Sequence, residues 1–177
     1  LHTDNSYNLC PPDYVALFCR QTAMQGGVSQ LVSFHAVHNR MRAECPDLLA
    51  RLYEDYTFDR QREHAPDDNM TVHHPLFAWD GAQLLGRLSK RMVFQGYELE
   101  NQEMDETSAA ALAALEATMT APEMMKEFHF QPGQIQIVNN KTLGHARTAF
   151  TDWPEPDRRR HLIRLWLRHQ GRAFYNG

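Results

Sequence analysis

The chain has 177 residues, of which 42% are hydrophobic and 23% charged, and these proportions suit one globular domain over residues 1–177. Its net charge of −4 gives no reason to expect nucleic acid or an anionic membrane as a partner. No segment approaches the ~18 consecutive apolar residues of a membrane-spanning helix. The three cysteines are odd in number and lack a CxxC spacing, so we expect reduced thiols in a cytoplasmic protein.

The first half of the chain is predicted to contain short strands followed by helices. Residues 14–19 form a β-rich run, and residues 31–32 resemble a second, shorter strand. Ser33 can cap a helix over residues 35–42, and Pro46 suits the first turn of another helix that ends at Leu52. The polar stretch 59–74 is predicted to be a mobile loop, of the kind that often closes over an active site.

The second half is predicted to be a hairpin, a helix and two more strands. Residues 75–79 and 83–88 flank an Asp-Gly turn and therefore predict the hairpin. Asp105 or Thr107 can cap an amphipathic helix that carries Leu112, Leu115 and Met119 on one stripe. Residues 134–138 alternate as a strand does, and residues 160–168 form the final strand. Together these elements predict a mainly β barrel or sandwich with helical insertions.

The most informative residues are His2, Asp4 and His145. A His-x-Asp pair with a distant histidine is the ligand set of the 2-His-1-carboxylate triad, which holds Fe(II) on one face and leaves other positions open. The pairs His35/His38 and His73/His74 lack a partner motif, so we expect them to be ordinary surface or core histidines.

The final strand carries two arginines on one predicted face. Residues two apart share a face, so Arg160 and Arg164 point the same way, with Leu162 and Trp166 beside them. Both faces of the strand look at least partly covered, and a buried guanidinium needs an anionic partner. The planar guanidinium suits a carboxylate, which either the protein or a ligand can supply.

In these features the chain resembles the Fe(II)/2-oxoglutarate-dependent dioxygenases of the taurine dioxygenase superfamily, which includes clavaminate synthase-like enzymes. The matching segments occur in the family's order and reach from one end of the chain to the other. They are residues 1–5 (Leu-His-Thr-Asp-Asn), 26–29 (Gly-Gly-Val-Ser), 132–140, 144–147 (Gly-His-Ala-Arg) and 159–164 (Arg-Arg-His-Leu-Ile-Arg).

The resemblance implies a role for each matching residue. His2, Asp4 and His145 would bind the iron. Arg160 would pair with the distal carboxylate of the co-substrate 2-oxoglutarate, helped by the Ser29 hydroxyl. The residues implied at the substrate are Arg164, which would hold an anionic group, with Asn5 and Arg147 beside the site.

The resemblance also implies a double-stranded β-helix, or jelly roll, that hydroxylates a small anionic or zwitterionic substrate with O₂ and releases succinate and CO₂. We expect the domain to lack an N-terminal segment that relatives carry before the His-x-Asp motif, so the barrel can be incomplete. Two alternatives remain open. One is a non-catalytic metal-binding β-barrel, and the other is a zinc hydrolase with the same three ligands. The hydrolase has no need for the arginine pair.

Overall fold

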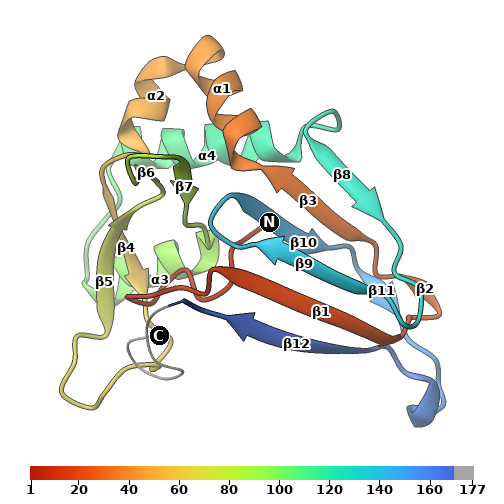
Figure 1. Cartoon of the computed structure of the whole chain (residues 1–177). Coiled ribbons are helices and arrows are strands. Elements are labelled where there is room, and N and C mark those ends of the chain that lie inside the picture. Colours follow the sequence, from red (N-terminus) through yellow and green to blue (C-terminus); the bar gives the residue numbers. More distant parts are fainter. Residues whose placement is uncertain (170–177) are drawn as a thin grey trace.

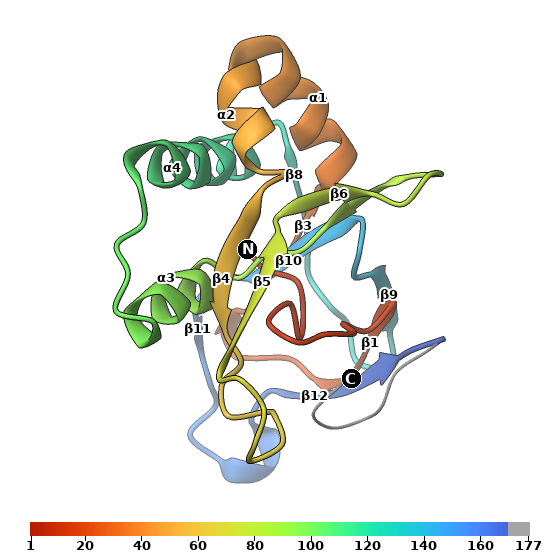
Figure 2. The same ribbon diagram turned by 90° about the vertical axis from the view of Figure 1, so that its left-hand side faces the viewer.

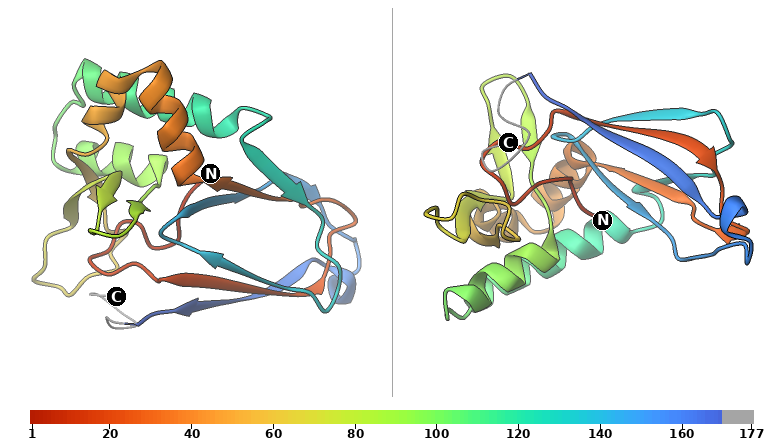
Figure 3. Two further views of the ribbon diagram at one scale, coloured as in Figure 1. Left: turned by 45° about the horizontal axis from the view of Figure 1, so that its top comes forward. Right: turned by 90° about the horizontal axis from the view of Figure 1, so that it is seen from below.

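Two three-stranded antiparallel sheets face each other in the computed structural model, which describes residues 1–169 (Figures 1 and 3). The first sheet has the order β12 (His161–Leu167), β1 (Tyr14–Gln21), β9 (Ile135–Asn139). The second has the order β10 (Leu143–Arg147), β3 (Ser29–Ser33), β8 (Met125–Phe128). Since β9 and β10 are consecutive, the short turn between them joins the two sheets.

Strand β1 shows why these segments form a sheet with one buried face. Val15 and Cys19 point inward and are at most 1% exposed, whereas their neighbours Tyr14 and Phe18 remain exposed on the outer face. Such alternation is the pattern of a half-buried strand. The outer face continues onto β12, where Ile163, Leu165 and Leu167 are exposed. The expectation that both faces of the final strand are covered is therefore wrong for its outer face within the described residues.

The α-helices of the described residues gather at one end of the molecule (Figures 1 and 2). They are α1 (Phe34–Glu44), α2 (Pro46–Arg51), α3 (Lys90–Leu99) and α4 (Glu106–Thr120). Ser33 caps α1 by accepting a hydrogen bond from Ala36 N, and Asp105 caps α4 by accepting one from Ser108 N. Both caps satisfy amide groups that have no partner within a helix, as the sequence predicts.

Helix α3 is not evident in the sequence because it contains a glycine, a poor helix former. The structure explains Gly96 by close packing: a Cβ atom there would lie 2.5 Å from the carbonyl oxygen of Thr57. Thr57 belongs to β4 (Asp55–Asp59), which pairs with β5 (Thr71–Pro75). The prediction of one loop over residues 59–74 is therefore wrong at its C-terminal end, because residues 71–74 are held in this hairpin and the loop is limited to residues 60–70.

The predicted hairpin around Asp80-Gly81 is confirmed, with strands β6 (Phe77–Trp79) and β7 (Leu84–Gly86). Asp80 Oδ1 accepts hydrogen bonds from the amides of Ala82 and Gln83, which fixes the turn. The largest apolar core lies between the helices and these hairpins, not between the two larger sheets. Its biggest fully buried members are Tyr56, Phe34, Phe58, Phe77, Met41 and Leu52.

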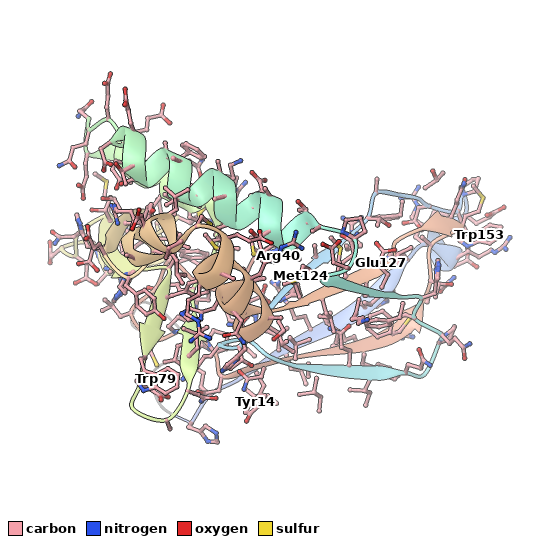
Figure 4. All side chains as sticks on the ribbon, turned by 90° about the horizontal axis from the view of Figure 1, so that it is seen from above. Tyr14, Arg40, Trp79, Met124, Glu127 and Trp153 are labelled. Atoms are coloured by element: carbon pink, nitrogen blue, oxygen red, sulfur yellow. The ribbon has the colours of Figure 1, made fainter. Side chains whose placement is uncertain are left out.

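The far end of the molecule, opposite the helices, is closed by short elements. These are β2 (Gln25–Gly26), β11 (Phe150–Thr151) and the 3₁₀ turn Pro156–Arg158. Trp153 lies at this end, where the Arg158 guanidinium stacks 3.6 Å from its ring centre (Figure 4). Within residues 1–169, no helix has the length and apolar character needed to cross a membrane.

Candidate metal centre

The structure brings together the three residues that the sequence predicts as metal ligands. His2 Nε2 lies 3.2 Å from Asp4 Oδ1, and His145 Nε2 lies 3.3 Å from the same oxygen. One ligand atom from each residue fits within 4.8 Å of the others, and residues 1–169 contain no other such group of His, Cys, Asp or Glu. Two imidazole nitrogens and one carboxylate oxygen are the donor set that suits Fe(II), so these residues fit the ion.

Backbone pairing places the two histidines side by side. His2 N donates to His145 O, and His145 N donates to His2 O, each at 2.9 Å. The two imidazole rings consequently lie 4.5 Å apart between centroids. Thr3 is fixed on the other side of the chain, since its amide donates to Leu88 O and its hydroxyl accepts from Leu88 N. The chain then turns at Asn5, whose φ is 53°.

The two oxygens of the Asp4 carboxylate have different partners. Oδ1 faces the two imidazoles, whereas Oδ2 accepts hydrogen bonds from Arg164 Nη1 at 3.0 Å and Trp166 Nε1 at 2.7 Å. Burial alone would raise the pKa of this carboxyl. Hydrogen bonds from His145, His2 and Trp166 outweigh burial and hold the pKa of Asp4 well below its usual range. Asp4 is therefore an anion at neutral pH, as a metal ligand must be.

A cavity of about 620 Å³ opens beside this cluster. It is lined by His2, Asp4 and the predicted substrate residues Asn5 and Arg164, together with residues that the sequence does not single out. The latter include Tyr7, Gln61, Glu63, Lys90, Arg91 and Trp166. Trp166 could have been found, since strand alternation places it on the face of Arg164. Gln61 and Glu63 belong to the polar stretch that the sequence predicts as a loop of the kind that closes over active sites, but no motif singles out either residue.

Arg160 lines a second cavity of about 270 Å³, with Cys19, Gly27 and His129 among its neighbours. Its guanidinium lies 5.3 Å from the Phe150 ring centre, and the Arg147 guanidinium lies 4.4 Å from the same ring. Burial, with the nearby charge of Arg147, lowers the pKa of Arg160. Among the described residues, Arg160 is the only lysine or arginine that lines this cavity. None of the three candidate ligands lines it.

The structure places Ser29 and Arg164 differently from the roles that the resemblance implies for them. Ser29 is buried and pairs with Arg147 across β3 and β10. It does not, however, line the cavity around Arg160. Arg164 is not buried: 53% of its side chain is exposed, and its anionic partner is Asp4 of this same chain. The sequence places Arg164 on the correct face, and the structure supplies a partner that the resemblance does not suggest.

Comparison with known proteins identifies several relatives. The model of the family described as "Taurine catabolism dioxygenase TauD, TfdA family" matches residues 1–166. The FR-33289 synthase of Streptomyces rubellomurinus is 30% identical over 167 residues, which are 92% of this chain and 49% of that protein. The taurine hydroxylase-like protein SAT17 of Stachybotrys chartarum is 29% identical over 166 residues, which are 93% of this chain and 40% of that protein. The chain thus spans at most about half the length of these relatives.

Solved structures show the same fold. An asparagine oxygenase in complex with Fe(II), 2S,3S-3-hydroxyasparagine and succinate aligns with a TM-score of 0.70 and 19% identity, covering 94% of this chain and 48% of that one. A taurine dioxygenase from Burkholderia xenovorans aligns with a TM-score of 0.68 and 20% identity, covering 96% of this chain and 57% of that one. The predicted jelly-roll class is therefore confirmed, and its two sheets remain open within the described residues.

Proposed function

Because the chain belongs to the TauD/TfdA family of taurine catabolism dioxygenases, we propose that the protein is an Fe(II)- and 2-oxoglutarate-dependent oxygenase. One observation carries the proposal: a single buried carboxylate oxygen faces the Nε2 atoms of two histidines. The chain provides three ligands, which leaves room for a bidentate 2-oxo acid and for O₂. When bound, Fe(II) would supply O₂ activation coupled to decarboxylation of 2-oxoglutarate to succinate and CO₂.

His2, Asp4 and His145 hold the metal in this proposal. Arg164 and Trp166 keep the Asp4 carboxylate in one rotamer, since both donate to the oxygen that faces away from the imidazoles. The remaining oxygen is then free for the metal. Such outer contacts orient a ligand and tune its basicity.

Arg160 binds the distal carboxylate of 2-oxoglutarate in this proposal. Its support is the cavity that Arg160 lines, together with the Arg147 guanidinium on the nearby Phe150 ring. Arg160 lies four residues before Arg164, whose guanidinium contacts Asp4, and strand alternation places both arginines on one face. Ser29, buried on the neighbouring sheet, is the proposed hydroxyl partner.

The proposed substrate is a small anionic or zwitterionic molecule that is hydroxylated at a C–H bond. Its support is the mixture of charges around the larger cavity, where Arg91 and Arg164 contribute positive groups and Glu63 a negative one. Asn5 also lines this cavity and can provide a hydrogen bond. The names of two structural neighbours refer to asparagine and taurine, which are small zwitterions.

An anaerobic titration with Fe(II) followed by 2-oxoglutarate tests the proposal. A visible charge-transfer band should develop only when both are present, because the 2-oxo acid must chelate the bound metal. His145→Ala should abolish the band, and Arg160→Leu should shift it to higher 2-oxoglutarate concentration. A folded protein that binds Fe(II) without developing the band would refute the oxygenase and favour a non-catalytic metal-binding barrel. Selective binding of zinc with hydrolytic activity would favour the hydrolase.

A further inference from the structure

Asn140 is a buried side chain that connects the two chain segments carrying the candidate ligands. It is 1% exposed and lies in the turn between β9 and β10, five residues before His145. Its Oδ1 accepts a hydrogen bond from Asp4 N at 2.8 Å, and its Nδ2 donates to Asp4 O at 2.9 Å. The same Nδ2 donates to Pro12 O at 3.1 Å. One side chain thus holds both backbone polar groups of Asp4.

The other two ligands do not need such a clamp. His145 belongs to β10 itself, and His2 is fixed to it by two backbone hydrogen bonds. Asp4 lies two residues further on, in a turn that leaves the strand direction at Asn5. Arg164 and Trp166 hold its carboxylate, but these contacts are to the side chain and not to the backbone. The buried amide of Asn140 is therefore the contact that ties the Asp4 backbone to the turn that leads into β10 and His145.

We propose that Asn140 is a positioning residue for the metal centre: it holds the Asp4 backbone in register with His145, so that all three ligands are fixed to β10 and to the turn that precedes it. The inference rests on the proposed function, since it assumes that these residues bind a metal. Asn140 is not among the candidate ligands and does not line the cavity beside them, so it acts on the metal centre through the Asp4 backbone.

The chemistry of the side chain explains why asparagine stands here. An amide offers one acceptor and two donors, and Asp4 and Pro12 use the acceptor and the donor group together. An aspartate of the same size would still accept from Asp4 N. It would, however, place a charged oxygen against the carbonyl oxygens of Asp4 and Pro12, leaving those acceptors unsatisfied. Alanine would leave all three groups without their partner.

Anaerobic titration with Co(II), a coloured divalent ion, tests the proposal by visible absorption without turnover. Asn140→Ala and Asn140→Asp should bind Co(II) roughly 10- to 100-fold more weakly than the unchanged chain, as outer contacts of metal ligands generally do. At saturation their spectra should also change, because the carboxylate is displaced. Asn139→Ala is the matched control. Asn139 is the last residue of β9, and its side chain accepts a hydrogen bond from Lys141 N instead of contacting the Asp4 backbone groups that Asn140 binds. This control should bind normally.

A double-mutant cycle separates positioning from general damage to the fold. On an Asp4→Ala background, which keeps the backbone groups that Asn140 contacts but lacks the carboxylate that it positions, the Asn140 substitution should weaken Co(II) binding less than about twofold. Equal losses on both backgrounds, or an unchanged spectrum at saturation, would overturn the proposal. If Asn140→Ala does not fold by circular dichroism, Asn140→Asp enters the same cycle. Absence of Co(II) binding by the unchanged chain would refute the proposed metal centre itself, whereas normal binding by both variants would refute only the role of Asn140.

Discussion

Replacing Trp166 with phenylalanine should weaken metal binding while leaving the fold intact. The indole Nε1 donates a 2.7 Å hydrogen bond to Asp4 Oδ2, the oxygen that faces away from the two histidines. Phenylalanine keeps most of the aromatic surface and removes this donor. Arg164 then remains as the other donor to that oxygen, through a side chain that is half exposed. The carboxylate should consequently rotate more freely between metal-facing and other orientations.

The size of the effect follows from the charge of the acceptor. A hydrogen bond to an ionised group contributes about 1.5–3 kcal/mol, and every 1.4 kcal/mol corresponds to about a tenfold change in an equilibrium constant. If the bond acts by orienting Asp4, most of that free energy should be lost from metal binding. Trp166→Phe should therefore raise the Kd for Mn(II) or Fe(II) by roughly 10-fold, and by at most roughly 100-fold.

Calorimetric titration with Mn(II) under anaerobic conditions measures this change. Trp79→Phe is a suitable control, because Trp79 is 61% exposed at the tip of the β6–β7 hairpin, away from the metal centre. That substitution should leave the Kd unchanged. Metal affinity in Trp166→Phe equal to that of the unchanged chain, with an intact circular dichroism spectrum, would show that the indole does not orient Asp4.

Three further predictions concern the second cavity, the helical end and pH. Arg160→Ala should raise the 2-oxoglutarate concentration needed for the charge-transfer band about 10- to 100-fold, whereas the neighbouring Arg159→Ala should leave it unchanged. Equal effects of the two substitutions would show that Arg160 does not bind the co-substrate. Gly96→Ala should lower the free energy of unfolding, measured in urea, by about 1–3 kcal/mol, because the new Cβ would lie 2.5 Å from Thr57 O. An unchanged free energy of unfolding would show that β4 can shift to make room for the methyl group. Burial lowers the pKa of His74 to about 4 in the folded protein, whereas the value in the unfolded chain is about 6.5. The stability that comes from the neutral imidazole is therefore fully present above about pH 6.5 and is lost as the pH falls towards 4. His74→Gln should therefore lose less stability than the unchanged chain between pH 7 and pH 5 in urea unfolding, and identical pH profiles would contradict this assignment.

Elements whose signals are local could be predicted from the sequence. Ser33 and Asp105 cap helices because their own side chains accept hydrogen bonds from amides three residues further on. The Asp80 turn is equally local. By contrast, β10 has the sequence Leu-Gly-His-Ala-Arg, which shows no clear alternation, and it is a strand because β3 pairs with it along its length. Its register is set by the tertiary structure.

The candidate site shows the same division between local and tertiary information. His2, Asp4 and His145 match the ligand set of the 2-His-1-carboxylate triad, and the resemblance of the surrounding segments to the dioxygenase family is what assigns the three residues to one site. Strand alternation also places Arg164 and Trp166 on one inward face. Neither pattern can reveal that both donate to Asp4, which is 160 or more residues away along the chain.

The contact between Arg164 and Asp4 changes how a substrate role for this arginine should be understood. A guanidinium has five N–H donors, and the hydrogen bond to Asp4 uses Nη1. The half-exposed side chain also lines the larger cavity, so its other donors can face a substrate anion there. Binding of that anion would then draw on the same group that orients a metal ligand. Substrate binding and ligand geometry would be coupled through Arg164, which a clamp separate from the metal centre could not achieve.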